Sequence, residues 1–107
     1  MKNVFQDMPY ADGKMGNRQL INEKHLLVMQ IALKPGQHVP EHSANSNVHL
    51  LVIEGDVVVT LDGQENAAPN GSLLPVAYKT RMSIRNTTSG NASFLVFKTP
   101  NPSEMNS

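Results

Sequence analysis

The sequence predicts an all-β fold, an antiparallel sandwich or barrel. Short runs rich in apolar and β-branched residues recur along the 107-residue chain, separated by turn dipeptides. Gly55-Asp56, Asp62-Gly63 and Asn70-Gly71 follow one another at intervals of seven and eight residues. No stretch shows a sustained apolar period of the kind found in amphipathic helices. The length suits one domain with its own core.

The first two predicted strands are 25–33 and 48–53. Residues 25–33 alternate, and their apolar face consists of Leu27, Met29, Ile31 and Leu33. Pro35-Gly36 ends this strand with a turn signal. Residues 48–53 are almost wholly apolar and short, which favours a strand covered on both faces.

Residues 57–61 are β-branched at four of five positions, which favours the extended backbone. Asp62-Gly63 follows directly, and both residues tolerate positive φ, so the pair predicts a hairpin. Residues 81–85 alternate, with Met82 and Ile84 on one face.

The last predicted strand, 92–98, is apolar on both faces. Phe94 and Val96 alternate with Leu95 and Phe97. We expect one face to line the barrel interior and the other to meet a second layer or a subunit partner. The sequence therefore predicts an N-terminal arm over 1–15, a barrel over 16–99 and a flexible tail over 100–107.

Composition excludes several kinds of site. The chain has no cysteine, which removes disulfides, thiolate zinc sites and thiol catalysis. Nine basic residues balance nine acidic ones, so neither nucleic acid nor a membrane surface is an expected partner. The first residues carry no apolar run typical of a signal peptide, and the expected location is the cytoplasm.

The segment 35–55 reads PGQHVPEHSANSNVHLLVIEG, and with this spacing of glycine, histidine and glycine it resembles the first motif of the cupin superfamily. That motif reads glycine, five residues, His-x-His, three or four residues, glutamate, six residues, glycine. Gly36, His42 and Gly55 stand at matching positions, and Pro40 and Glu54 are also common in such proteins.

The segment 71–86 resembles the second cupin motif, with Gly71 and Asn86 at its two ends. An alternative register that begins at Gly63 fits only the first half and places Leu74 at the histidine position. The resemblance covers about residues 20–98. It implies a cupin-type double-stranded β-helix, or jelly-roll, barrel and a homodimer.

Metal-binding cupins use two histidines and the glutamate of the first motif and one histidine of the second. Of these four positions only His42 keeps a ligand, because the others hold Ala44, Val48 and Met82. A divalent ion needs three or more converging donors. The sequence therefore predicts no conventional catalytic metal and no other cofactor.

Two further histidines are candidates for a rebuilt metal site with His42. His38 is four residues away, but Pro40 between them excludes the helix on which such a pair would converge. His49 follows the glutamate position and points away from Val48 in a regular strand, unless a bulge turns it inward.

The predicted interior is an apolar pocket with one polar group, lined by His42, Ala44, Val48, Leu50, Met82 and Ile84. Such a mixture is typical of a small-molecule site, which is the predicted function. One alternative is an interior that these side chains fill completely. A second is a cupin enzyme of the isomerase, decarboxylase or dioxygenase type that uses His42 together with Tyr78 or with a rebuilt metal site. A third is a non-catalytic dimeric scaffold.

Overall fold

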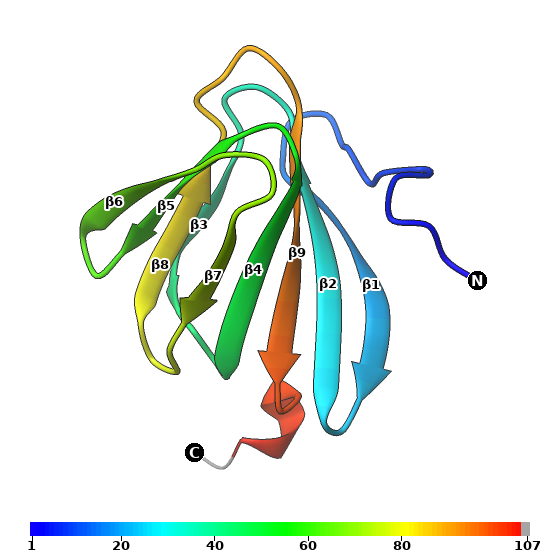
Figure 1. Cartoon of the computed structure of the whole chain (residues 1–107), viewed down its shortest axis with the longest axis vertical. Helices are drawn as coiled ribbons and strands as arrows, with labels where there is room; N and C mark the ends of the chain where they lie inside the picture. Colours follow the sequence, from blue (N-terminus) through cyan, green and yellow to red (C-terminus); the bar gives the residue numbers. More distant parts are fainter. Residues whose placement is uncertain (106–107) are drawn as a thin grey trace.

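A computed structural model describes residues 1–105. Their nine strands form two antiparallel sheets that face one another (Figure 1). The larger sheet has the order β1-β2-β9-β4-β7, with bounds Gly16–Glu23, Leu26–Leu33, Ala92–Thr99, Asn47–Glu54 and Leu73–Val76. The smaller has the order β3-β8-β5-β6, with bounds His38–Ser43, Arg81–Arg85, Val57–Leu61 and Gln64–Ala68. The predicted all-β jelly roll is confirmed.

The strands predicted from apolar runs are all present, as β2, β4, β5, β8 and β9. The sequence did not single out β1, β3, β6 and β7 as strands. β1 is largely polar and lies at the edge of the larger sheet, so only part of its surface is covered. Within residues 1–105 no helix is long and apolar enough to cross a membrane.

The core lies between the sheets and is built from alternate residues of the central strands. Val48, Leu50 and Val52 of β4 point inward, whereas His49 is exposed on the outer face. On β9 the inward residues are Phe94 and Val96. Burying a side chain of this size stabilises the fold by about 1.5–3 kcal/mol.

Two of the predicted turns show why their residues are needed. Asp62 and Gly63 both have positive φ, 47° and 83°, and join β5 to β6 in the predicted hairpin. Gly55 has φ of 64°, and a Cβ there would lie 2.2 Å from the carbonyl oxygen of Asn91. Only glycine fits this contact between the end of β4 and the loop before β9.

Asn86, at the end of the second motif, has a structural role. It is 1 % exposed, and its Nδ2 donates to the carbonyl oxygens of Leu33, at 3.0 Å, and Gly90, at 2.8 Å. Its Oδ1 accepts from the backbone N–H of Thr88 at 3.0 Å. Asn86 thus connects the end of β2 to the loop between β8 and β9.

The first part of the N-terminal arm, residues 1–15, lies on the outer face of the larger sheet of its own chain, whereas Met15 at the end of the arm turns to the inner side. Gln30, fully buried there, donates to the carbonyl oxygen of Val4 at 2.8 Å and accepts from Arg18 at 2.8 Å. Tyr10 donates to Glu54. Burial, reinforced by this contact, raises the pKa of Tyr10 above its ordinary value.

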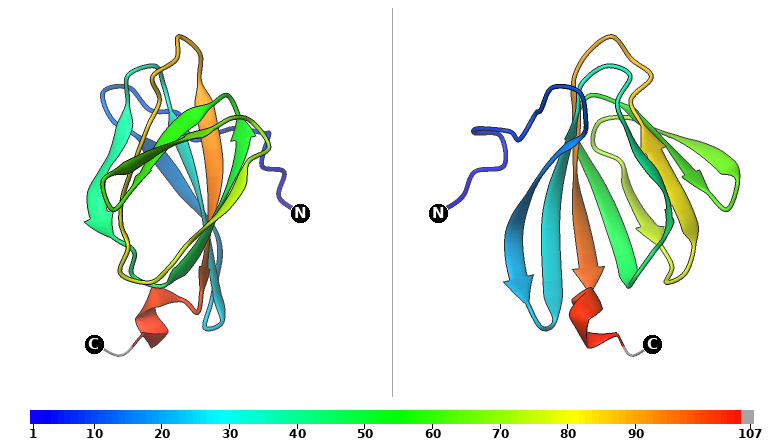
Figure 2. Two further views of the ribbon diagram at one scale, coloured as in Figure 1. Left: turned by 60° about the vertical axis from the view of Figure 1, so that its left-hand side comes forward. Right: turned by 180° about the vertical axis from the view of Figure 1, so that it is seen from behind.

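The chain after β9 forms a short 3₁₀ helix, η1, at Pro102–Glu104, below the end of β9 (Figure 2). Asn101 caps it and donates to Asn22 Oδ1 at 2.7 Å and to the carbonyl oxygen of Glu23 at 3.1 Å. Residues 100–105 of the expected flexible tail are thus joined to the β1–β2 turn. Residues 106–107 lie outside the described residues.

Candidate functional site

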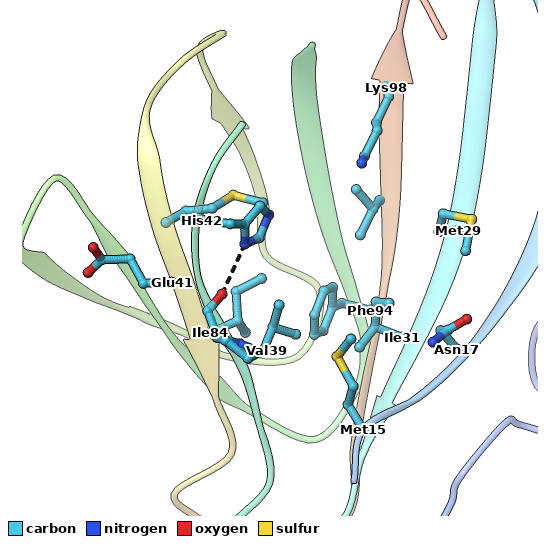
Figure 3. A pocket seen from close by; sticks show the side chains of 13 residues that line it. Met15, Asn17, Met29, Ile31, Val39, Glu41, His42, Ile84, Phe94 and Lys98 are labelled. Carbon is cyan, nitrogen blue, oxygen red and sulfur yellow. Dashed lines mark hydrogen bonds between the residues drawn. The ribbon is translucent and has the colours of Figure 1, made fainter. Parts of the chain in front are cut away.

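A cavity of about 460 Å³ opens between the two sheets, beside the packed core (Figure 3). Its wall takes residues from β1 and the segment just before it, and from β2, β3, β8 and β9. The wall is mostly apolar, and its apolar side chains are Met15, Met29, Ile31, Val39, Met82, Ile84, Phe94 and Val96. This is the kind of concave apolar site that small ligands occupy.

The strand period of two explains most of this wall. Met29 and Ile31 share one face of β2, and Met82 and Ile84 share one face of β8. On β9 the same alternation continues from Phe94 through Val96 to Lys98, which therefore points toward the cavity rather than outward.

β3 departs from this period at a β-bulge. Val39 pairs with Ile84 and His42 pairs with Met82, so three steps along β3 match two steps along β8. The extra residue lies at Pro40-Glu41, and proline is suited to a bulge because it lacks the N–H that a ladder needs. The bulge places both Val39 and His42 on the wall of the cavity.

His42 is held by its own strand. Its Nδ1 lies 3.0 Å from the carbonyl oxygen of Pro40. Because a carbonyl oxygen only accepts, Nδ1 carries the proton and donates. In the neutral ring Nε2 then remains an acceptor for a ligand's hydroxyl or N–H group. Much of the ring is exposed, since β3 forms the edge of the smaller sheet beside the opening.

Lys98 is the cationic group of the cavity, and sequence reasoning missed it. It is half-buried, and its Nζ donates to Asn45 Oδ1 at 3.0 Å. Burial lowers the pKa of the Lys98 amine below its ordinary value, because the charged form loses part of its water. The missed signal was its position two residues after Val96, on the inward face of the last strand.

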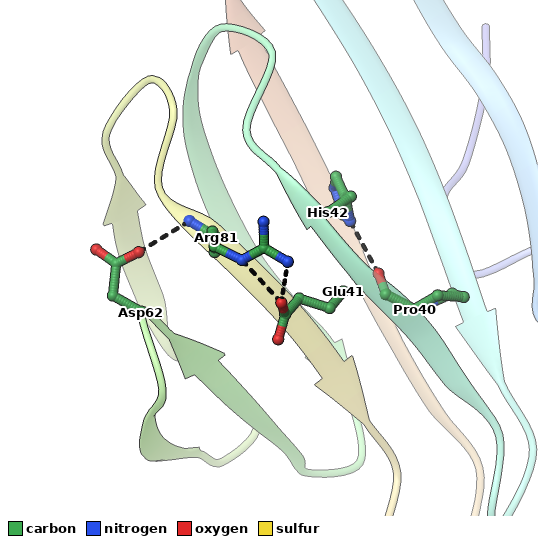
Figure 4. A network of polar contacts seen from close by, with 5 residues as sticks. All are labelled: Pro40, Glu41, His42, Asp62 and Arg81. Carbon is green, nitrogen blue, oxygen red and sulfur yellow. Dashed lines mark hydrogen bonds and ion pairs between the residues drawn. The ribbon is translucent and has the colours of Figure 1, made fainter.

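Glu41 lies at the rim, but its carboxylate turns away from the cavity. It pairs with Arg81, whose Nε lies 2.8 Å from Glu41 Oε1 (Figure 4). The backbone N–H of Arg81 donates to Asp62 Oδ1 at 3.0 Å. Glu41 is thus held by Arg81 on the outer side of β8 and forms no ion pair with Lys98.

Three of the six predicted pocket residues, His42, Met82 and Ile84, line the cavity. The other three do not, and this part of the prediction is corrected. Ala44, Val48 and Leu50 are 2 %, 1 % and 1 % exposed and belong to the packed core. They are packed in the buried core together with Val57, Val59 and Val76.

The rebuilt metal site is also corrected. His38 pairs with Arg85 on the outer face of the smaller sheet, and His49 is exposed on the outer face of the larger one. Within residues 1–105 no group of three His, Cys, Asp or Glu side chains is placed to hold a metal ion. One imidazole beside Ala44, Val48 and Met82 does not fit a cupin metal centre.

Comparison with known proteins supports the fold and the family. No protein-family model matches the chain. Uncharacterised protein MJ0764 of Methanocaldococcus jannaschii is 35 % identical over 89 residues, which cover 82 % of this chain and 77 % of that one. The crystal structure of that protein is described as an RmlC-like cupin family protein with a double-stranded β-helix fold. It superposes on this chain with a TM-score of 0.84 and 30 % sequence identity, and the match covers 95 % of this chain and 91 % of that chain.

More distant structures share the architecture. TT1209 of Thermus thermophilus superposes with a TM-score of 0.86 at 24 % identity, covering 94 % of this chain and 96 % of that one. A double-stranded β-helix protein of Klebsiella pneumoniae gives a TM-score of 0.87 at 14 % identity, covering 94 % and 90 %. At these identities the likeness shows the fold alone. The sheet order and the relationship to the Methanocaldococcus protein together place this chain in the RmlC-like cupin family.

Proposed function

We propose that this cupin binds a small molecule with an apolar body in the cavity between its two sheets, without a conventional catalytic metal. The observation that carries the proposal is a cavity of about 460 Å³ whose wall holds eight apolar side chains. This volume lies within the roughly 300–1,000 Å³ range of small-ligand sites. Each methylene of a ligand transferred from water to such a wall contributes about 0.8 kcal/mol.

The composition of the wall supports an adaptable binding site. Met15, Met29 and Met82 contribute three of the six methionines of the chain. Methionine is unbranched and polarizable, so it can adjust its rotamer to a ligand and contact aromatic rings favourably. A site built this way accepts a class of apolar shapes rather than one rigid outline.

The proposal of metal-free binding rests on the donor set. His42 is the only imidazole on the wall, and the nearby carboxylate of Glu41 is engaged by Arg81. Two donors, one of them already paired, do not replace the water shell of a divalent ion.

The test uses anilinonaphthalene, an uncharged fluorophore that brightens in apolar surroundings. We expect saturable binding to the wild-type protein and binding at least about tenfold weaker in Met29→Trp, because the larger ring occupies the cavity. Met29 is only partly buried, so the extra bulk can extend toward solvent.

Met8→Trp is the matched control, since Met8 is partly buried in the arm and does not line the cavity. It should bind the fluorophore as the wild type does. Equal binding by all three proteins would place the fluorophore elsewhere, and no binding by the wild type would refute the proposed site.

A further inference from the structure

We infer that the ligand of this cavity carries an anionic group, most simply a carboxylate on an apolar body, and that Lys98 binds it. The inference rests on the proposed function, because it assigns the chemical class of the ligand for the same cavity. It is carried by the position of one ammonium group, the charges around it and the distribution of polar groups along the wall.

Lys98 and His42 lie toward the same end of the cavity. Lys98 is the penultimate residue of β9 and His42 the penultimate residue of β3, and both strands finish at the same end of the barrel. Figure 3 shows both side chains toward that end, whereas Met15, Phe94 and the uncharged Asn17 lie toward the other. A ligand that matches this wall has a polar head and an apolar body.

No carboxylate among residues 1–105 matches the charge of Lys98. An ammonium group has three N–H donors, and Asn45 accepts from one of them. Within residues 1–105 no carboxylate forms an ion pair with Lys98, and Glu41 is turned toward Arg81. At least one further N–H donor of this positively charged group therefore remains available to a ligand.

The burial of the Lys98 ammonium group determines which charge on a ligand binds most favourably beside it. The lowered pKa of the Lys98 amine indicates that the protein does not fully replace the water lost around the ammonium group. A carboxylate would restore that stabilisation through a charge-assisted hydrogen bond in a region of reduced dielectric constant. A neutral head would do so less well, and a cationic head would be repelled.

The experiment displaces anilinonaphthalene with three compounds that share an apolar body, phenylbutanoate, phenylbutanamide and phenylbutylamine, at constant ionic strength. We expect the carboxylate to bind about tenfold more tightly than the amide, and the amine to bind most weakly. Constant ionic strength matters because added salt screens the attraction.

Lys98→Met removes the charge and keeps an unbranched apolar stem. We expect it to lose the preference for carboxylate over amide, with each displacement measured against the variant's own affinity for anilinonaphthalene. Lys24→Met is the control with the same change in net charge, since Lys24 is exposed in the β1–β2 turn and absent from the wall. It should keep the preference, and the melting temperature of each variant reports whether it folds.

The two proposals fail in different ways. If the amide and carboxylate displace the fluorophore equally, or if Lys98→Met keeps the preference, the anion site is wrong while the apolar cavity remains a binding site. If anilinonaphthalene does not bind the wild type, the proposed function fails. Calorimetry with phenylbutanoate alone then decides the anion site, and an absence of binding heat overturns it.

Discussion

At the scale of single residues, Lys98 combines a cost to stability with a position suited to binding. Its ammonium group loses part of its water on folding. Within residues 1–105 this group donates a hydrogen bond to the side-chain amide of Asn45 and forms no ion pair with a carboxylate. Half-buried lysines without a counterion are unfavourable to the fold. Positions where local rules are broken in this way are where functional sites are expected.

We therefore expect Lys98→Met to leave the free energy of unfolding at neutral pH unchanged or to raise it by less than about 1 kcal/mol. The pKa of Lys98 is lower in the folded than in the unfolded protein. Between these two values the unfolded state binds more protons, so wild-type stability rises with pH across that interval. The gain in free energy of unfolding of Lys98→Met over the wild type is therefore complete at pH values below the folded-state pKa of Lys98 and disappears at pH values above the unfolded-state pKa.

Urea titrations of both proteins at neutral pH and near pH 10.5, the ordinary pKa of a lysine amine, measure this difference. A loss of more than about 1 kcal/mol in the variant at neutral pH would show instead that Lys98 stabilises the fold.

At the scale of elements, the bulge in β3 and the arm decide what the wall of the cavity contains. Without the extra residue at Pro40-Glu41, strand alternation from Val39 would send His42 outward. His42, which the cupin-like spacing singled out, lies on the cavity wall, whereas alternation along β3 alone would not place it there. The polar face of β1 gave no apolar signal, so its contribution to the wall could not be read from periodicity.

The arm covers a polar patch on the outer face of the larger sheet. Gln30 donates to the carbonyl oxygen of Val4 there and approaches Ser93 Oγ at 3.3 Å. We expect deletion of residues 1–11 to lower the free energy of unfolding by about 2–4 kcal/mol, because Gln30 loses a buried partner and apolar contacts are exposed.

Tyr10→Phe provides a graded control, since it removes only the hydrogen bond to Glu54 and should cost about 0.5–1.5 kcal/mol. Chemical denaturation compares the three proteins. Equal stability of the truncated and full chains would mean that the arm does not contribute to the fold.

At the scale of the whole molecule, the jelly-roll class could be predicted from the sequence, with five of the nine strands of residues 1–105, whereas the cavity could be predicted only in part. Turn dipeptides, strand spacing and the motif glycines agree with one another, and such agreement between levels specifies a fold. Whether an inward residue lines the cavity or packs in the core depends on the spacing of the two sheets at its position. For Val48 and Leu50 on β4 the interior is filled, whereas for Ile31 and Val96 it is open, and strand periodicity does not distinguish these cases.

The outer face of β4, β7 and β9 leads us to expect a homodimer. Leu51 and Leu73 are cross-strand neighbours there, Phe97 lies on the same face, and Leu73 is 65 % exposed. Burying such a face in a two-fold interface removes apolar area from water.

We expect sedimentation equilibrium to give twice the chain mass for the wild type and a monomer for Leu73→Lys. Ile21→Lys, on the opposite edge strand of the same sheet, should remain dimeric. A monomeric wild type at micromolar concentration would contradict the expectation.

The methyl resonances of isotope-labelled methionines, followed during titration with anilinonaphthalene, report whether a small apolar molecule enters the space between the sheets. Three of the six methionines line the cavity, Met15, Met29 and Met82, and three lie elsewhere, Met1, Met8 and Met105. We expect the first three resonances to shift to saturation together while the other three stay in place. Unchanged resonances of Met15, Met29 and Met82 at saturating fluorophore would contradict binding between the sheets.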